Sequence, residues 1–322
     1  KSFDEAKNFN KEFEIFNKNI TILDEKEILK DTKHILKNLD HLCGDSSIVP
    51  TYNLIKGIKK KTKVLISGDG GDEAFLGYII FKALYGAKKI KIIPSFILDL
   101  IKVVTNNLPV SEAYISNSFK IKKFFQDINS DIKNLTPLWM SPLKLSDYNN
   151  LFDREFSQDF FCEDFSELSK NYLKNLKLYF YNYYLPYSVL FKTDFASMLN
   201  SVEYRSPLLS KSVINLSLSQ KIENLFSLTK QKKLMMEIFK NQIPRSLNKI
   251  PKHGFAFPKN IVINRDNIKE FIIEKNLINK KFFYDKLENY FSKKEDCGQY
   301  LWNEIIYTNV ISNSNANNYN EK

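Results

Sequence analysis

Residues 63–73 read Lys-Val-Leu-Ile-Ser-Gly-Asp-Gly-Gly-Asp-Glu, an apolar run that passes directly into a loop of glycines and acids. The shortness of residues 63–67 and their valine and isoleucine content predict a buried parallel strand. In the loop that follows, glycines let the backbone approach a phosphate, and carboxylates hold magnesium or position a nucleophile. Asp69, Asp72 and Glu73 are the candidates for that role. The alternative is a tight surface turn whose acids cap the next helix.

The rest of the chain is predicted to be mostly helical. Residues 1–40 carry apolar side chains spaced for one buried helix face, and two later stretches repeat this pattern. We therefore expect an α/β part at about 1–85, a helical part at about 86–311 and a disordered, Asn- and Ser-rich tail at 312–322. The two later stripes, both expected to be packed helix faces, are Ile93, Phe96, Ile97, Leu100, Ile101 and Val104, and Tyr172, Leu176, Tyr179, Phe180 and Tyr183.

Composition narrows the function class. The 322 residues include 48 Lys+Arg and 37 Asp+Glu, for a net charge of +11, and 43% are hydrophobic, so the body of the chain is globular. The lysines are interspersed and no nucleic-acid-binding module is legible, so no nucleic-acid partner is expected. No apolar stretch is long enough for a membrane span, and no signal peptide opens the chain. Three scattered cysteines, Cys43, Cys162 and Cys297, predict no disulfide framework and a cytoplasmic protein.

A specific resemblance begins at the glycine loop. The stretch Ser67-Gly68-Asp69-Gly70-Gly71-Asp72-Glu73, ending in Gly77-Tyr78, resembles the S-G-D/E-G-G/S-D-E-x-F-x-G-Y signature of glutamine-dependent asparagine synthetases. That signature lies in their C-terminal synthetase domain. It is neither a Walker loop nor a G-x-G-x-x-G fingerprint, so kinase-type and Rossmann sites lack support.

Three further blocks agree with this family in the same order along the chain. Residues 45–52, Asp-Ser-Ser-Ile-Val-Pro-Thr-Tyr, resemble its D-x-S-x-x-P-T-Y segment. Residues 192–198 and 201–209 resemble K-x-D-x-x-S-M and S-x-E-x-R-x-P-F-L. Residues 251–255, Pro-Lys-His-Gly-Phe, closing with Pro258, resemble P-K-x-G-F…P. The resemblance extends over the whole chain except the tail.

The resemblance implies a fold and an activity. The fold is α/β, with a parallel sheet of the ATP-pyrophosphatase (adenine nucleotide hydrolase-like) type and a large helical part. The activity is that of a carbon–nitrogen ligase: ATP and Mg²⁺ convert aspartate to β-aspartyl-AMP, and ammonia from a glutaminase domain displaces AMP to give asparagine. A homodimer is left open as the assembly.

The family also implies roles for individual residues of this chain. Asp69 takes the position tied to forming or consuming the acyl-adenylate, as a base for ammonia. Asp72 is the magnesium contact or an active-site acid. The residues implied to lie against ATP are Ser67, Gly68, Gly70 and Gly71.

Two lysines are implied to act with this loop. Lys252 matches the lysine that faces the pyrophosphate, where a compact ammonium suits the phosphates. Lys192 is a candidate for the same pocket, and its alternative is an exposed lysine on an amphipathic helix. For Glu203 and Arg205 we favour a structural ion pair or a helix-end contact over direct catalysis.

Several family features are absent from these residues. No S-G-G-x-D-S-S phosphate loop occurs, and residues 44–47, Gly-Asp-Ser-Ser, lack the paired glycines and a preceding apolar strand. The catalytic N-terminal cysteine and the glutaminase domain are also absent from the sequence. We therefore expect an incomplete synthetase domain whose first strands are missing here. Two alternatives stay open: a paralogue that amidates another carboxylate, on a sugar or a secondary metabolite as in β-lactam synthetases, and a catalytically inactive remnant or binding subunit.

We predict that the purified 322-residue chain makes no asparagine from aspartate, ATP and ammonia at a useful rate. A site without its phosphate loop loses much of its transition-state stabilisation. The measurement is aspartate-dependent release of pyrophosphate. Release by this chain alone would contradict the prediction.

Overall fold

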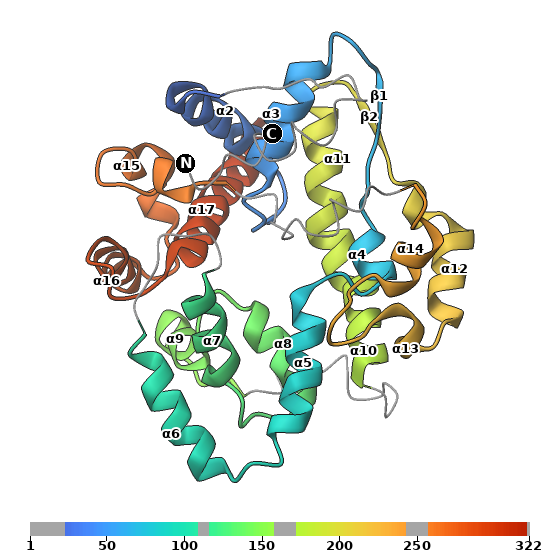
Figure 1. Cartoon of the computed structure of the whole chain (residues 1–322). Helices are drawn as coiled ribbons and strands as arrows, with labels where there is room; N and C mark the ends of the chain where they lie inside the picture. The colour runs from blue at the N-terminus through green and yellow to red at the C-terminus, as the bar shows by residue number, and fades with distance from the viewer. Residues whose placement is uncertain (1–22, 109–115, 158–171, 243–256, 321–322) are drawn as a thin grey trace.

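The computed structural model describes residues 23–108, 116–157, 172–242 and 257–320. Helices dominate these residues, with one small sheet among them (Figure 1). The first elements along the chain are α2 (Glu25–Asn38), α3 (Ile48–Ile58), β1 (Val64–Ile66), α4 (Gly71–Ala74), α5 (Ile79–Ile90), α6 (Ser95–Asn106), α7 (Asn117–Gln126), α8 (Ile132–Met140) and α9 (Leu145–Phe152).

The second half contains a long composite helix, the other strand and the C-terminal helices. Its elements are α10 (Tyr172–Tyr179), the π-helix η3 (Phe180–Leu190), α11 (Phe191–Met198), β2 (Glu203–Arg205), the 3₁₀-helix η4 (Pro207–Leu209), α12 (Lys211–Ser219), α13 (Ile222–Leu225), α14 (Lys233–Ile238), the 3₁₀-helix η6 (Lys259–Ile261), α15 (Ile268–Phe271), the 3₁₀-helix η7 (Glu274–Asn276), α16 (Lys280–Phe291) and α17 (Gly298–Asn320).

Helix α2 shows how local chemistry sets a boundary. The Asp24 carboxylate accepts a hydrogen bond from the backbone N–H of Glu27 at 2.7 Å, and the Glu27 carboxylate accepts one from the backbone N–H of Asp24, a capping box that starts the helix. Ile35 and Leu36 are buried, and so is Leu39 just after the helix. The predicted apolar face of this segment is confirmed for these residues.

The sheet pairs β1 with β2 in parallel, with Val64 opposite Glu203 and Ile66 opposite Arg205. The predicted parallel strand is therefore confirmed, but its predicted burial is wrong, because Ile66 is 77% exposed. Among the described residues the sheet has two strands, so neither strand is enclosed as in a large parallel sheet. Glu203 and Arg205 form the expected ion pair, 2.7 Å from Nε to Oε1, on the exposed side of β2. The result is a mostly helical chain with a small parallel sheet, consistent with an α/β synthetase domain.

Two hydrophobic cores lie on either side of the glycine loop. The first joins α2, α3 and α11 to the C-terminal helices, with Trp302 and Phe283 fully buried in it. The second joins α4, α5, α8, α10 and η3 around Phe81 and Phe180. Leu65 of β1 packs against the first core, whereas residues 74–76 belong to the second. The intervening residues 66–73 therefore cross between the two cores, and each core draws on segments from both sides of residue 85.

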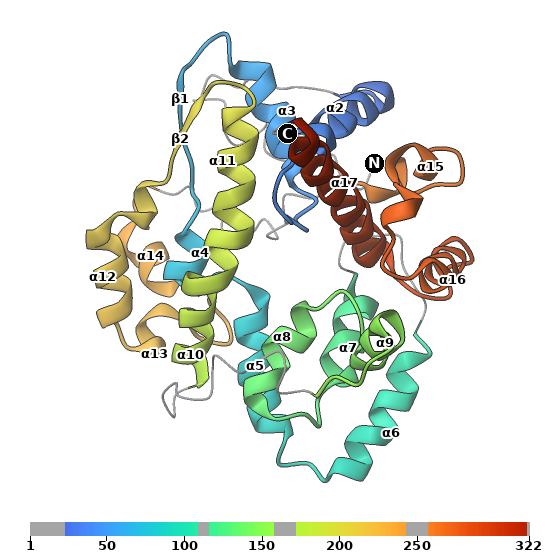
Figure 2. The ribbon, with the colours of Figure 1, turned by 180° about the vertical axis from the view of Figure 1, so that it is seen from behind.

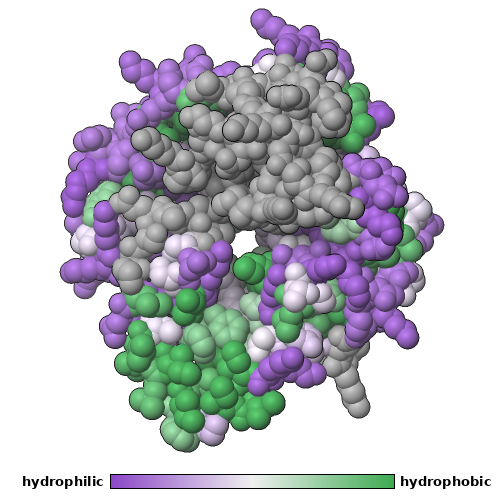
Figure 3. All heavy atoms as spheres, in the orientation of Figure 1, coloured by the Kyte–Doolittle hydropathy of each residue, from purple (hydrophilic) through white to green (hydrophobic). Residues whose placement is uncertain are grey.

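The expected packed face of residues 93–104 is wrong. Phe96, Leu100 and Val104 are 65%, 63% and 69% exposed, and α6 buries Leu98 and Thr105 instead. The exposed side chains form part of the apolar patch at the lower left of Figure 3, over the position of α6 in Figure 1. Periodicity identified an apolar helix face correctly, but of this stripe only Ile101 packs against the second core, beside the buried Leu98.

The second predicted stripe lies on the composite helix formed by α10, η3 and α11 (Figure 2). Leu176 and Phe180 are buried in the second core, and Tyr172 and Tyr179 pack against it, so this packed face is confirmed. Pro186 lies inside η3. A proline has no N–H to donate and clashes with the preceding turn, which favours the wider π geometry there.

Helix α17 contradicts the predicted C-terminal tail, because it continues to Asn320. Its anchor is apolar: Leu301, Trp302 and Ile305 are fully buried in the first core. The Asn and Ser residues extend a helix that this packing has already started. No helix in the described ranges is both long and apolar enough to cross a membrane.

A buried lysine links α10 to the segment after the glycine loop. Lys177 is 2% exposed, and its Nζ donates to the backbone oxygen of Ser217. The Ser217 hydroxyl donates in turn to the backbone oxygen of Ala74 at 2.7 Å. Burial removes water from the ammonium and lowers the pKa of Lys177 to about 8.

We predict that this lysine makes stability depend on pH above 8. The unfolded chain holds the Lys177 proton up to a pKa of about 10.4, so between about 8 and 10.4 it binds more protons than the folded chain. Stability conferred at this position therefore rises with pH across that window, by at most about 1.4 kcal/mol per pH unit. Urea unfolding of wild type and Lys177→Met at pH 7 to 10 measures the difference. The exposed Lys174→Met on the same helix is the control, and an identical pH trend in all three proteins would contradict the prediction.

Candidate functional site

The candidate site lies where β1 ends and the glycine loop begins. The backbone N–H of Ser67 donates to the backbone oxygen of Arg205 at 2.8 Å, which extends the strand pairing by one residue. The hydroxyls of Ser67 and Ser206 lie 3.0 Å apart. The loop therefore leaves the carboxyl end of a parallel strand, where sheets of this kind bind ligands.

Glycine is required at one position of the loop for a clear reason. Gly70 has φ +88°, and a Cβ there would lie 2.2 Å from Leu209 Cδ2. Gly68, by contrast, faces open space. Two backbone donors are used inside the loop, because the Asp69 N–H donates to Ser67 Oγ at 3.2 Å and the Gly71 N–H to the Gly68 oxygen at 3.2 Å. The loop is thus a fixed turn, held against η4 by Gly70.

Asp69 has a shifted pKa and a buried carboxylate oxygen without a hydrogen-bond donor among the described residues. Its Oδ2 is buried and accepts no hydrogen bond from any described residue. Burial raises the pKa of the Asp69 carboxyl, while the nearby Lys192 ammonium and a hydrogen bond from Ser67 oppose the rise. A carboxylate oxygen left in this state is positioned to accept a proton or a hydrogen bond from a ligand.

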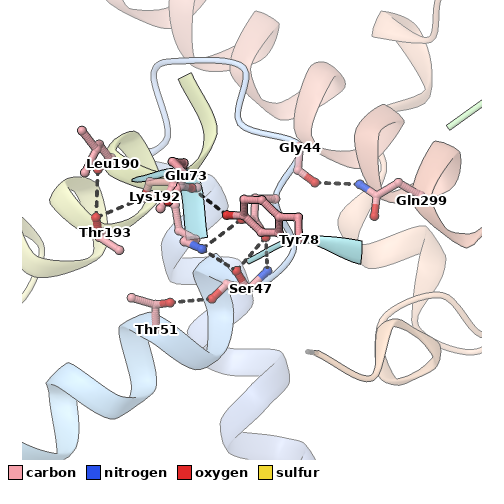
Figure 4. Close-up of polar contacts among 11 residues, drawn as sticks. Gly44, Ser47, Thr51, Glu73, Tyr78, Leu190, Lys192, Thr193 and Gln299 are labelled. Atoms are coloured by element: carbon pink, nitrogen blue, oxygen red, sulfur yellow. Dashed lines mark hydrogen bonds and ion pairs between the residues drawn. The ribbon is translucent and has the colours of Figure 1, made fainter. Parts of the chain in front are cut away.

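Lys192 reaches the site from the first turn of α11. Its Nζ donates to Asp45 Oδ2 at 3.0 Å and to Ser47 Oγ at 2.9 Å (Figure 4), and its side chain is 12% exposed. Ser47 Oγ donates to Asp45 Oδ1 at 2.6 Å, so Lys192, Asp45 and Ser47 form a hydrogen-bonded triad. The alternative of an exposed surface lysine is therefore wrong. The triad unites two of the blocks that resemble the family, although neither block by itself indicated the contact.

Asp72 is paired with a lysine that sequence reasoning missed. Lys232 Nζ lies 3.0 Å from Asp72 Oδ1, with both side chains mostly shielded. A Cβ at Gly77 would lie 1.8 Å from Asp72 Oδ1 and 2.4 Å from Lys232 Cε, so the pair closes over that glycine. Lys232 lies between the blocks that resemble the family, and no local pattern marks it.

Glu73 does not face the site. Its side chain is buried, and the Tyr78 hydroxyl donates to its Oε1 at 2.6 Å (Figure 4). Tyr78 stacks on Phe180 in the second core, with ring centroids 4.9 Å apart. Burial raises the pKa of Glu73, and the bond from Tyr78 opposes the rise. Of the three acids suggested as magnesium ligands, this one is structural.

Next to the Lys192 triad, a hydrogen bond connects Gly44 to the C-terminal helix α17. Gln299 of α17 donates through Nε2 to the backbone oxygen of Gly44 at 2.7 Å (Figure 4). Its Oε1 accepts from Lys259 Nζ at 2.9 Å. Burial lowers the pKa of Lys259, and the charges of Asp296 and Asp45 oppose the decrease. Lys252 lies outside the described residues, although Lys259 belongs to the segment that follows it.

The donor set fits magnesium held together with a substrate. No group of three or more His, Cys, Asp or Glu within the described ranges could form a metal cage. Magnesium usually takes one or two carboxylates and completes its shell with phosphate oxygens and water. Asp72 and the unsatisfied oxygen of Asp69 provide such carboxylates. Burial raises the pKa of Asp69, and the nearby Asp72 charge adds to the rise.

Comparison with known proteins identifies the family. The family model for asparagine synthase matches residues 3–310. The chain belongs to the asparagine synthase family. It is 25% identical over 285 residues to asparagine synthetase [glutamine-hydrolyzing] 1 of Bacillus subtilis, an alignment that covers 82% of this chain and 42% of that protein. No solved structure matches the chain significantly.

A second asparagine synthase family relative aligns over a shorter region. A protein of Methanocaldococcus jannaschii, provisionally named asparagine synthetase [glutamine-hydrolyzing] 2, is 36% identical over 85 residues, or 26% of this chain and 16% of that protein. The chain thus spans less than half the length of the curated relatives it matches.

We predict that Gly70→Ala destabilises the chain whereas Gly68→Ala does not. The alanine at 70 combines a left-handed backbone with overlap against Leu209, and we expect a loss of about 1–3 kcal/mol in the free energy of unfolding. At Gly68 the new methyl group meets nothing within 4 Å. Urea unfolding of both variants is the measurement, and equal stabilities would show that the turn is not fixed as described.

Proposed function

We propose that this chain is the synthetase part of an enzyme that activates a carboxylate with ATP and transfers ammonia to it. Membership of the asparagine synthase family supports a ligase of this kind. The single observation that carries the proposal is the buried, unsatisfied Oδ2 of Asp69 beside the shielded Lys192–Asp45 pair. A carboxylate oxygen without a hydrogen-bond donor, near a fixed cation, suits a reaction in which charge and protons move.

The proposed reaction has two steps. A carboxylate oxygen of the substrate attacks the α-phosphorus of ATP, and pyrophosphate leaves with the electron pair of the broken P–O bond. Ammonia then attacks the acyl carbon, AMP leaves, and Asp69 accepts the proton that the nitrogen loses. The Asp69 carboxylate has to be ionised for this, and the Lys192 charge favours the ionised form against the effect of burial on its pKa.

Other residues of the chain are assigned to binding. We propose that Ser67, Gly68, Gly70 and Gly71 line the ATP site and that Lys252 faces the pyrophosphate. Lys192 holds the start of α3 through Asp45 and Ser47 and adds positive charge to the same region. When bound, Mg²⁺ would neutralise phosphate charge, and Asp72, with Asp69 nearby, would hold it.

Aspartate is the proposed acceptor, with asparagine as product. This assignment rests on the names of the two relatives, asparagine synthetases described as glutamine-hydrolysing. The ammonia would accordingly come from a glutaminase domain, and a homodimer remains a proposal.

The test is carboxylate-dependent exchange of labelled pyrophosphate into ATP, followed by amide formation with ammonium chloride. It uses the complete native protein that contains this chain, at full length. Exchange that depends on aspartate supports the proposal. Exchange that depends on another carboxylate, from a panel of sugar acids and amino acids, would identify an amidotransferase paralogue. No exchange with any carboxylate would indicate an inactive remnant or a binding subunit.

We predict that Asp69→Asn in the complete protein lowers kcat by about 10²–10⁴-fold, the usual contribution of a general base. The amide keeps the size of the carboxylate but cannot accept the proton, so KM for ATP should change far less than kcat. Initial rates of amide formation give both constants. A near-parental kcat in a folded variant would mean that the loop is only a structural turn.

A further inference from the structure

Helix α6 has two apolar faces, and the described residues bury only one of them. The buried face carries Leu98 and the partly buried Ile101, which pack in the second core. Because an α-helix has about 3.6 residues per turn, Phe96, Leu100 and Val103 lie on the side of α6 opposite to these two. This second face is exposed and continues into the corner between α5 and α6. Its members, called the α6 face below, are Ile92, Ile93, Phe96, Ile97, Leu100, Val103 and Val104.

Polar contacts hold α6 in place while its second face stays exposed. Asn129, which follows α7, donates through Nδ2 to Oδ1 of Asp99 on α6 at 2.8 Å. Lys91, in the corner between α5 and α6, donates through Nζ to the backbone oxygen of Ser130. Helix α6 lies at the outer edge of the structure in Figures 1 and 2, and the apolar patch over it forms part of the surface in Figure 3. The α6 face is therefore presented at the edge of the molecule by a helix that is fixed on its other sides.

The surroundings of the α6 face are basic. The described residues between 88 and 126 include seven lysines and one acid, Asp99, which gives this region a net charge of +6. Asp127, just after α7, lies near two of these lysines and offsets part of the charge. Lys88 and Lys89 are exposed, and they come just before the corner of the α6 face. The seven lysines are Lys88, Lys89, Lys91, Lys102, Lys120, Lys122 and Lys123.

We propose that the α6 face docks on an anionic lipid bilayer, with its apolar side chains among the acyl chains and the lysines at the headgroups. A contiguous exposed apolar patch marks an interaction surface. A helix that combines a wide apolar face with basic flanks is suited to lie in the plane of a bilayer interface. Anionic headgroups complement the lysines around the face. Docking of this kind needs no helix that spans the membrane.

Charge and shape favour a bilayer over a protein as the occupant. A second copy of this chain would bring its own lysines against those of the first, and like charges across an interface oppose association. A protein partner would need an apolar groove to receive the projecting helix. A bilayer needs no groove, because its lipids move apart around the inserted side chains.

The experiment is vesicle flotation of the complete native protein that contains this chain. Vesicles of phosphatidylcholine alone are compared with vesicles of an equal mixture of phosphatidylcholine and phosphatidylglycerol. We expect binding to the mixed vesicles, binding at least about tenfold weaker to the neutral ones, and a further loss as salt screens the lysines. A wild-type protein that does not float with the mixed vesicles would overturn the inference.

Two double variants test the apolar and the basic parts separately. Phe96→Ser with Leu100→Ser removes the centre of the apolar face, and we expect binding to the mixed vesicles to weaken at least about tenfold. Lys88→Gln with Lys89→Gln should weaken it about tenfold or more, since each lysine near an anionic bilayer contributes about fivefold. All four side chains are exposed, so both variants should keep the wild-type melting curve.

Matched controls alter exposed side chains outside the α6 face. Leu54→Ser with Leu216→Ser removes two exposed leucines, on α3 and α12. Lys26→Gln with Lys269→Gln removes two exposed lysines, on α2 and α15. Both controls should bind the mixed vesicles as the wild type does. If the Phe96 and Leu100 variant also binds like the wild type, the attraction comes from net positive charge alone and the inference is overturned.

Phe96→Trp shows whether the face enters the bilayer. Its emission, measured against the background of Trp139 and Trp302, should shift to shorter wavelength on the mixed vesicles. Lipids brominated on the acyl chains should quench it. Binding without quenching would mean adsorption at the headgroups and would overturn the insertion of the apolar face.

Sedimentation of the same proteins tests the other occupant. A wild-type dimer that Phe96→Ser with Leu100→Ser dissociates, in a protein that does not bind vesicles, would show that a second copy covers the face and would overturn the bilayer proposal. Pyrophosphate exchange should be unchanged in both α6-face variants, because none of these residues is assigned to the reaction. Failure of the ligase proposal and failure of membrane docking are therefore separate results.

Discussion

The parallel pairing of Val64–Ile66 with Glu203–Arg205 is the constraint on which the rest of the site depends. It brings the glycine loop against residues more than 130 positions later in the chain, and Ser67 and Ser206 continue the contact beyond the strands. The same pairing fixes where α11 ends and η4 begins. Lys192 and Leu209 thus both act on the loop, one through charge and the other through close packing.

The loop also connects the two hydrophobic cores. Leu65 belongs to the packing of the first core and Ala74 to that of the second, so the residues between them are held at both ends. Ile66 and Gly68 are exposed, and Asp69 and Asp72 are only partly buried, so part of the loop is open to solvent. A site at such a junction combines fixed flanks with access, a combination that neither core alone would offer.

The shielded lysines of the chain are largely paired with acids. Those at the site have acidic partners: Lys192 pairs with Asp45 and Lys232 with Asp72. Away from the site, Lys286 likewise contacts Asp147 and Glu295. Burying an ammonium is costly unless a carboxylate or another acceptor compensates. The ion pairs therefore offset the cost of burying these lysines.

The sequence predicted local features well and their surroundings poorly. The strand, the turn and the Glu203–Arg205 pair follow from short-range pattern, and all three are present. The exposure of Ile66 and Phe96 depends on what packs against them, which periodicity does not encode. Collinear motifs pointed to Lys192, but its partners Asp45 and Ser47 emerged only from the tertiary structure.

Lys232 and Glu73 also lie where the sequence did not predict. Lys232 belongs to no motif, yet it contacts the loop because Gly77 leaves space for it. Glu73 belongs to the motif, yet it turns inward because Tyr78 offers a buried hydroxyl. In both cases a neighbouring residue decides where the side chain lies. The pattern of a single sequence does not encode that neighbour. The predicted roles of Asp69, Asp72 and the loop glycines stay proposals.

The π-helix η3 has a consequence for the rotational phase of the composite helix. Its wider i→i+5 turns rotate the chain by a smaller angle per residue than α turns do. Accumulated over the 11 residues of η3, this difference changes which side of the helix every later residue faces. Leu176 and Phe180 can therefore point into the second core while Lys192 points toward Asp45. The number of residues in the π segment therefore sets the angle between the side chains that precede it and those that follow it.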